Sequence, residues 1–458
     1  MVFSSVFFVW IFLPIVLFLY YLSSFIFRND DEKRIKASNL LLLAASILFY
    51  GLGGYRYLFL LLLVLVINFF GGIAIGKGFR IALIPTAALD IVILSFFKFA
   101  DTFTDIVLPL GISFYMFQSM SYVIDVYRGN AVVQKSFIRF SLYVSLFPQL
   151  VAGPIVKYSD IEKQLSKREV GSDKFFDGVI RFCFGMGKKV LIANTLAEPV
   201  DAIWGTNIKG LGAGVTWFGA LCYILQLYFD FSGYSDMAIG LGKMFGFEFK
   251  ENFEHPYSST SIQEFWRRWH ISLSNWFKEY VYIPLGGSRC GNLRLVLNYI
   301  IVFALTGLWH GANWTFLSWG LFNGLLIISE RVFTGKILKK NPVKILNRLY
   351  TLAMVTIGFA MFRSVNIEQG MSFLSEMFSK RNSVYTVFSY LSMRVMIALL
   401  VGTVISFPVY GGIDKKLSSG EGSMLWENIK GILAITVFIL SMTEIIAGSY
   451  NPFLYFQF

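Results

Sequence analysis

Residues 294–330 read RLVLNYIIVFALTGLWHGANWTFLSWGLFNGLLIISE, and the 35 residues between Arg294 and Glu330 carry no charged side chain. A straight helix over this run would be about 52 Å long, because an α-helix rises roughly 1.5 Å per residue. The hydrocarbon core of a bilayer is only about 30 Å thick. The run must therefore bend, tilt steeply or turn back, and the sequence GLWHG at 307–311 is the expected place.

His310 lies near the middle of this apolar run, between Gly307 and Gly311. An ionisable side chain is costly at membrane depth, so an intramembrane histidine indicates a functional site by default. The alternative is a buried histidine that makes structural hydrogen bonds only. We favour the functional interpretation and predict that His310 is a catalytic base. Trp309 and Asn313 are candidate substrate-binding neighbours by position alone.

A second histidine, His270, lies in a helix that we expect to begin at Ser261. Ser261 and Glu264 have the spacing of a capping box, and Pro284 with the following glycines ends the helix. On a helical wheel, apolar and polar side chains separate into two faces, which is typical of a helix at the membrane–water boundary. His270 falls at the edge of the apolar face, so it can point inward. The apolar face holds Trp266, Trp269, Leu273, Trp276, Phe277 and Tyr280, and the polar face holds Arg267, Arg268, Asn275, Lys278 and Glu279.

Arg267 and Arg268 have two possible roles. On an interfacial helix, a basic face contacts lipid phosphates. Alternatively, the two guanidinium groups bind the phosphates of an activated acyl donor. Both arginines are therefore candidate substrate-binding residues.

Asp230 and Asp236 interrupt another apolar run, 210–242. Six residues correspond to about 240° on a helix, so the two carboxylates do not form a pair on one face. Gly233 is a possible helix break between them. Capping or helix pairing is the structural interpretation. The functional one is a carboxylate that orients a histidine or lines a cavity, so both are candidate substrate-binding residues.

The composition is that of a polytopic membrane protein. Hydrophobic residues make up 56% of the chain and charged residues only 15%, whereas a soluble domain has about 25% charged residues. The net charge of +12 comes from basic residues gathered in short loops, which sets membrane orientation and does not indicate nucleic-acid binding. Three cysteines without a CxxC pair argue against a zinc site or a disulfide framework. We expect one membrane-embedded domain over residues 1–458.

Apolar run lengths predict about ten to twelve transmembrane or re-entrant helices. Basic residues after the first run place the N-terminus outside the cytoplasm. Eight basic residues between Lys157 and Lys189 place that loop inside, which requires Phe140–Val156, with its prolines and glycine, to enter the membrane without crossing. Such broken backbone survives at membrane depth only beside protein or water. The expected location is the cytoplasmic (inner) membrane. The candidate runs are Val2–Phe27, Ala37–Tyr55, Tyr57–Gly76, Ile81–Phe97, Ile106–Ile124, Phe140–Val156, Phe175–Val200, Gly210–Gly242, the run after Arg294, Leu349–Phe362, Val395–Ile413 and Gly431–Thr443.

Acyl transfer is the chemistry that these residues allow. A sugar hydroxyl is a weak nucleophile at neutral pH, and a positioned neutral imidazole that removes its proton accelerates transfer by about 10²–10⁴-fold. Burial keeps a histidine neutral. A thioester donor leaves readily, so we expect no metal and no tightly bound cofactor. His270 and His310 are 40 residues apart and lack metal-ligand spacing, and Ser235 is not in a G-x-S-x-G elbow.

Three blocks carry a family resemblance: FDFSGYSDMAIGLGKMFGF at 229–247, FWRRWHISLSNWFKEYVYIPLGG at 265–287 and GLWHGANW at 307–314. Together they resemble the membrane-bound O-acyltransferase family, in particular its bacterial branch of alginate-type polysaccharide O-acetyltransferases. The D-alanyl-transferring branch of teichoic acid synthesis is similar around the first histidine but usually lacks YIPLGG. The resemblance extends from about Lys98 to Glu330, the expected catalytic core, and the flanking regions match only in hydropathy.

The resemblance implies a ring of tilted helices around a central water-accessible tunnel, with His310 at its centre and His270 as the second family histidine. It implies that acetyl-CoA or another acyl thioester approaches from the cytoplasm. The acetyl group then leaves on the outer side for an exported or cell-envelope polysaccharide, often through an extracytoplasmic acetyltransferase partner. D-alanyl transfer to teichoic acid or another envelope acceptor is the alternative. The alternative of a different class, a transporter or channel, also has broken helices and midplane polar residues.

Overall fold

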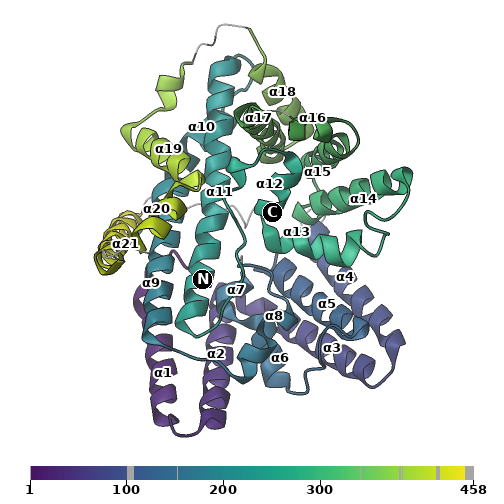
Figure 1. Ribbon diagram of the computed structural model, residues 1–458, viewed down its shortest axis with the longest axis vertical. Coiled ribbons are helices and arrows are strands. Elements are labelled where there is room, and N and C mark those ends of the chain that lie inside the picture. The colour runs from purple at the N-terminus through teal and green to yellow at the C-terminus, as the bar shows by residue number, and fades with distance from the viewer. Residues whose placement is uncertain are drawn as a thin grey trace. The chain divides into compact units, whose positions relative to one another are not determined.

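The protein is predominantly helical in the part of the chain that its computed structural model describes, which is residues 2–100, 108–151, 153–340, 342–380, 383, 385–418 and 423–448. Within these ranges there is no β-strand. The chain divides into two compact units, whose elements are labelled in Figure 1. The predicted all-α membrane architecture is confirmed, whereas the ring around a tunnel stays a prediction.

Unit 1 consists of Met1–Met186 and Tyr234–Glu251. Its helices are α1 (Leu13–Ile26), α2 (Asp31–Gly54), α3 (Leu58–Gly76), α4 (Leu83–Ala100), α5 (Ile112–Arg128), α6 (Phe137–Ser145), α7 (Phe147–Leu150), α8 (Tyr158–Ser166) and α9 (Ser172–Gly187), with short π or 3₁₀ segments η1 (Phe8–Phe12), η2 (Tyr55–Tyr57) and η3 (Arg80–Ala82).

Unit 2 consists of Gly187–Gly233 and Asn252–Phe458. Its elements are η4 (Lys188–Ala193), α10 (Asn194–Trp204), α11 (Gly212–Met244, which belongs to unit 1 from Tyr234 on), η5 (Pro256–Ser258), α12 (Ile262–Arg268), α13 (Ile271–Phe277), η6 (Lys278–Tyr282), α14 (Asn292–His310), α15 (Trp314–Ser329), η7 (Glu330–Thr334), α16 (Gly335–Lys340), α17 (Lys344–Arg363), α18 (Ile367–Met377), η8 (Val387–Tyr390), α19 (Met393–Ser406), α20 (Val409–Ser418) and α21 (Ser423–Ile446).

In unit 1, a buried arginine joins two neighbouring helices. Helices α1 and α2 lie side by side (Figure 1). Arg168, only 4% exposed, donates to the Tyr20 hydroxyl of α1 over 3.0 Å and to Asn39 Oδ1 of α2 over 2.6 Å. Its guanidinium also lies 4.6 Å from the ring centroid of Phe247. Arg168 therefore links α1 and α2 through hydrogen bonds and packs on an aromatic ring.

In unit 2, the long apolar run forms a helical hairpin, so of the three predicted alternatives, a bend, a steep tilt or a turn back, the chain turns back. Helix α14 ends at His310, α15 begins at Trp314, and the two pack closely against each other. Glycines make this approach possible. A Cβ atom added to Gly307 would lie 2.5 Å from the carbonyl oxygen of Phe316, and one added to Gly320 would overlap the carbonyl oxygen of Phe303. Small residues allow backbones to approach where helices pack in membranes.

Eight helical stretches in the described chain are long and apolar enough to cross a membrane. The prediction of ten to twelve exceeds this number because two predicted runs are joined in the 46-residue stretch Asp31–Gly76 and other apolar runs fold into short pieces. Phe140–Val156 contains most of the 9-residue α6 and all of the 4-residue α7, and Val395–Ile413 contains most of the 14-residue α19. The run that starts at Ile106 begins outside the described residues. The eight are Phe8–Ile26, Asp31–Gly76, Arg80–Phe99, Gly212–Met244, Asn292–His310, Trp314–Thr334, Lys344–Arg363 and Met424–Ile446.

Candidate functional site

Helix α12 begins with its first three amide groups satisfied. Ser261 Oγ accepts from Glu264 N over 3.1 Å, as the capping-box prediction required. The reciprocal half differs, because the Glu264 carboxylate accepts from Thr260 N rather than from the Ser261 amide. The remaining two amides, of Ile262 and Gln263, donate to the carboxylate of Glu330 over 2.7 and 3.0 Å. Glu330 is only 1% exposed, so a buried anion from η7 holds the start of α12.

The predicted single helix from Ser261 to Pro284 is wrong, because the backbone breaks at His270. Helix α12 ends at Arg268 and α13 begins at Ile271. His270 adopts the left-handed conformation, with φ of 43°, which costs a non-glycine residue roughly 1–2 kcal/mol. A break of this kind persists only where surrounding structure enforces it.

Asn252 supplies that enforcement. Its carbonyl oxygen accepts from Ile271 N over 2.8 Å, and its side-chain Oδ1 accepts from the Ser272 amide over 3.1 Å and the Ser272 hydroxyl over 2.9 Å. Asn252 is 2% exposed. These bonds fix the backbone directly after His270. The ring of His270 therefore points inward because the helix breaks at this residue, and not because the residue lies on the apolar face of a continuous helix.

His310 reaches the interior as the last residue of α14. Its ring centroid lies 5.0 Å from that of Phe362 and 5.3 Å from that of Trp319, both in edge-on geometry. Trp309 lies between the two histidines, 4.6 Å from the ring of His310 and 6.4 Å from that of His270. The structure therefore brings together three residues that the sequence singled out.

The two histidines line one small cavity of about 20 Å³. Both are buried, with 4% of His270 and 9% of His310 exposed. The other lining side chains are aromatic or aliphatic: Leu227, Phe231, Trp266, Trp269, Leu273, Trp319, Phe359 and Phe362. A cavity of this size holds about one water-sized group.

Burial has a direct consequence for His270. It lowers the pKa of the imidazole below its ordinary value, because the charged form loses hydration. Nδ1 of His270 has no hydrogen-bond partner among the described residues. The ring is therefore neutral near pH 7 and has a nitrogen available to a substrate.

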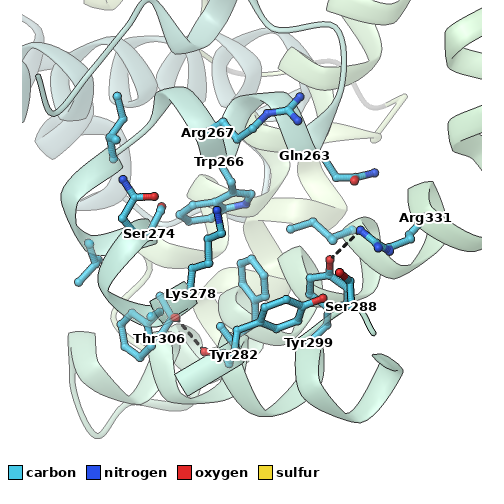
Figure 2. A pocket seen from close by; sticks show the side chains of 17 residues that line it. Gln263, Trp266, Arg267, Ser274, Lys278, Tyr282, Ser288, Tyr299, Thr306 and Arg331 are labelled. Atoms are coloured by element: carbon cyan, nitrogen blue, oxygen red, sulfur yellow. Dashed lines mark hydrogen bonds between the residues drawn. The ribbon is translucent and has the colours of Figure 1, made fainter. Parts of the chain in front are cut away.

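A larger cavity of about 590 Å³ lies on the other side of Trp266 and Leu273, the two residues that line both cavities. Figure 2 shows the indole of Trp266 among the side chains of this larger cavity. Three of them are cations from three different elements: Arg267 of α12, Lys278 of η6 and Arg331 of η7. None of the described residues that line the cavity is acidic.

Arg267 and Arg268 have different surroundings. Arg267 is exposed and lines the larger cavity. Arg268 instead forms an ion pair with Glu264, at 2.8 Å, and donates to the carbonyl of Glu254. The expected face toward the membrane boundary is also wrong for two tryptophans of this segment, because Trp269 and Trp276 are each only 5% exposed inside the unit.

Asp230 and Asp236 make the contacts of helix-pairing residues. Asp230 forms a buried ion pair with Lys189, and Asp236 accepts from Arg181 over 2.8 and 3.1 Å. The predicted helix break at Gly233 is wrong, because α11 continues through it. The two carboxylates belong to different units, and neither lines the histidine cavity.

Asn313 has a structural role that sequence position did not reveal. Its Oδ1 accepts from Thr315 N over 3.1 Å and caps α15, while its Nδ2 donates to the carbonyl of Val365 over 2.6 Å. It therefore fixes the hairpin turn after His310 and is absent from the lining of the cavity. Cys183 and Cys222 are buried, as expected for small hydrophobic residues, and Cys290 is half-buried.

Sequence reasoning missed Asn252 and Glu330 as residues that position the site. An asparagine in a polar loop and a glutamate at the end of an apolar run carry no local signal for contacts with Ser272 or Ile262. Lys278 was noted only as part of a polar face, whereas it lines the larger cavity.

Comparison with known proteins gives consistent matches. The membrane-bound O-acyltransferase family matches residues 131–367. A probable alginate O-acetylase of Pseudomonas putida is 38% identical over 100% of both chains. A peptidoglycan O-acetyltransferase of Helicobacter pylori is 34% identical over 82% of this chain and 80% of its own. A teichoic acid D-alanyltransferase of Bacillus subtilis is 30% identical over 55% of this chain and 65% of its own.

The extent of these matches corrects one expectation. Similarity was expected to stop at about Lys98 and Glu330, with the flanking regions alike only in hydropathy. The alignment to the Pseudomonas putida protein instead covers the whole chain.

Proposed function

Because this chain belongs to the membrane-bound O-acyltransferase family, we propose that it transfers acetyl groups to an exported or cell-envelope polysaccharide, with His310 and His270 as its catalytic residues. The observation that carries this proposal is one largely apolar cavity that both histidines line. A neutral imidazole is suited to general-base catalysis on a hydroxyl group. The chain is a multi-pass membrane acyltransferase.

His310 is the proposed base. Its imidazole takes the proton from the attacking hydroxyl as the oxygen bonds to the thioester carbonyl carbon. The carbon–sulfur bond then breaks, and the proton passes to the departing sulfur as the thiol is released. The products are an O-acetyl ester and the thiol of the carrier, and His310 returns to its neutral form. No metal ion is required for this balance.

His270 is the proposed second base or a group that orients the donor. Its buried, lowered-pKa imidazole with an available Nδ1 supports either role. Trp309 contacts both rings and is proposed to fix their positions relative to each other. Asp230 and Asp236 are proposed to act at most through the packing of α11, given their ion pairs with Lys189 and Arg181.

Acetyl is the proposed group because the histidine cavity is small. A space of about 20 Å³ favours the smaller of the two acyl groups, and its lining is apolar apart from the two histidines. A D-alanyl group carries a further methyl and a charged ammonium, whose burial without a partner is costly. The names of the longest-matching relatives, which are O-acetylases, support the same choice.

Donor and acceptor are proposed to meet from opposite sides of the cytoplasmic membrane. Acetyl-CoA or another acyl thioester approaches from the cytoplasm, and the acetyl group leaves outside, with an extracytoplasmic acetyltransferase as partner. This arrangement places the N-terminus outside and the loop at 157–189 inside, on the distribution of basic residues. Single cysteines labelled from either side of intact cells test it, and labelling of the 157–189 loop from outside would contradict the orientation.

The test of function is transfer of labelled acetyl by the purified full chain, with an acetyl thioester and polysaccharide fragments. His310→Gln is expected to lower the rate by about 10²-fold or more, because an amide cannot take up the proton. His270→Gln is expected to lower it less. His255→Gln is the matched control, because His255 also has a left-handed backbone, with φ of 46°, but does not line the cavity. A His310→Gln protein with near-normal transfer would disprove the assignment of the base.

A further inference from the structure

The cavity of about 590 Å³ holds three positive charges without acidic neighbours. Arg267, Lys278 and Arg331 all line it, and no described acidic residue does. None of the three forms a salt bridge with an acidic side chain in the described chain. Charges of one sign that converge on one cavity repel each other and favour an anionic ligand.

The polar groups around these charges add hydrogen-bonding capacity. Arg331 donates to the hydroxyl of Tyr299 over 3.4 Å, and Ser274 and Ser288 line the same space (Figure 2). Arginine binds phosphate through a planar pair of donors and lysine through a compact charge. The volume lies in the range typical of small-molecule sites, about 300–1,000 Å³. The chemistry indicates a phosphate-bearing molecule of cofactor size.

We propose that this cavity, defined by Arg267, Lys278 and Arg331, binds the phosphate-bearing carrier of the acyl thioester, and that Trp266 separates the carrier from the acyl group. The proposal rests on the proposed function. It deepens that function by assigning the two halves of the donor to two cavities. The carrier is too large for the histidine cavity of about 20 Å³, so only its acylated end reaches the histidines.

Trp266 occupies the boundary that this division requires. It lines both cavities, together with Leu273. Its indole Nε1 donates to Asn323 Oδ1 over 3.3 Å, and its ring meets those of Phe303 and Trp319 edge-on, at 5.4 and 5.7 Å. The same Trp319 packs on His310. Trp266, at the end of the proposed carrier site, therefore packs against Trp319, which itself contacts the proposed base His310.

Lipid headgroups present the same phosphate chemistry and are the competing source. A headgroup needs only a basic surface, whereas this cavity shares two side chains with the histidine cavity. That shared boundary favours the acyl carrier. The experiment below separates the two sources.

The first measurement is binding of CoA, dephospho-CoA, 4′-phosphopantetheine and pantetheine to the purified full chain in detergent. We expect affinity to fall along this series as phosphate groups are lost, and to fall with added salt because the cations are exposed. Lys278→Gln and Arg331→Gln should each weaken CoA binding by about tenfold, the scale of one charge-assisted hydrogen bond. Arg289→Gln is the matched control, because Arg289 is exposed nearby but does not line the cavity.

Three results would overturn the proposal. The first is equal affinity for CoA and pantetheine, or no detectable binding of any phosphorylated member. The second is CoA affinity in Lys278→Gln and Arg331→Gln that matches Arg289→Gln. The third is displacement of CoA by vesicles of phosphatidylglycerol but not by phosphopantetheine, which would assign the cavity to lipid. Binding of an acyl carrier protein through its phosphopantetheine arm, weakened to the same extent in Lys278→Gln and Arg331→Gln, would support the proposal. It would show that the carrier is a protein.

The second measurement tests the role of Trp266. Trp266→Ala joins the two cavities, so transfer of butyryl relative to acetyl should rise by about tenfold or more. Trp314→Ala is the control for loss of a tryptophan, since Trp314 is 71% exposed and lines neither cavity. An unchanged ratio in Trp266→Ala would contradict the assigned boundary.

Failure of this inference and failure of the proposed function give different results. His310→Gln should lower transfer by about 10²-fold or more and leave CoA binding intact. CoA binding as predicted in a protein without acetyl transfer would retain the carrier site and reject the enzymatic proposal. Normal acetyl transfer in a protein whose CoA binding does not depend on charge would retain the enzymatic proposal and reject the carrier site.

Discussion

The two histidine segments reach the same cavity by different means. His310 ends a helix whose hairpin partner packs against it through glycines, Gly307 and Gly320 among them. His270 lies at a strained break between two seven-residue helices, held by Asn252 and, at the start of α12, by Glu330. The first arrangement depends on shape, and the second depends on buried hydrogen bonds between distant segments. The following predictions separate these two sources of order.

The largest effect is expected from the hairpin. In Gly320→Val the new side chain meets the carbonyl oxygen of Phe303 on α14, and backbone cannot move aside as a flexible side chain does. We expect a loss of about 1–3 kcal/mol or more of stability, with activity lost as the hairpin opens. Thermal unfolding in detergent measures it. Gly431→Ala is the control, because a Cβ atom at Gly431 has no neighbour within 4 Å; equal stability of the two variants would disprove close packing.

The next largest effect is expected at Glu330. Glu330→Ala removes the acceptor for the amides of Ile262 and Gln263, and unsatisfied buried donors cost about 1–3 kcal/mol. Glu330→Gln keeps one acceptor oxygen and should lie between Ala and the unaltered protein. Glu32→Ala, at an exposed glutamate in the first turn of α2, should leave stability almost unchanged, because exposed ion pairs contribute little. Hydrogen exchange of the α12 amides is the local measurement, and unchanged protection in Glu330→Ala would contradict the cap.

A smaller and more selective effect is expected at Asn252. Asn252→Ala leaves the Ser272 amide without its acceptor and loosens the break at His270. We expect kcat to fall by about tenfold, the equivalent of one buried hydrogen bond, with little change in KM. Asn252→Asp keeps the acceptor oxygen and should restore most of the rate. Equal kcat in the Ala and Asp variants would show that Asn252 does not position His270.

The smallest effect is expected in the pH profile. A base must be neutral, so activity is lost when the pH falls through the pKa of the folded protein. Burial lowers the pKa of His270, so the part of the acid limb of kcat/KM that His270→Gln removes should lie below the ordinary histidine value of about 6.5. The same shift makes the folded state resist protonation, and stability should also decline only as the pH falls below that value. An acid limb above pH 6.5 that disappears in His270→Gln would contradict this assignment.

Much of the candidate site was predictable where the signal is local. The length of the uncharged run required a bend, a steep tilt or a turn back, because helix rise and bilayer thickness are fixed quantities, and GLWHG indicated where the chain turns. The helix cap at Ser261 was likewise predictable, because the capping-box pattern lies within four consecutive residues. The same local logic failed at His270, where a helical wheel assumes an unbroken helix, and at Gly233, where a glycine inside α11 does not end it.

The sequence by itself determined that this chain is a helical membrane protein, that it belongs with O-acyltransferases, and that His310 and His270 are its candidate catalytic residues. Only the tertiary structure decided that these histidines share a cavity, that Arg267 lines a neighbouring cavity whereas Arg268 pairs with Glu264, and that Asn252 and Glu330 hold the break and the cap. The physical reason is distance along the chain. The contact from Glu330 to Ile262 joins residues 68 positions apart, and no pattern within either segment specifies a partner that only packing brings near.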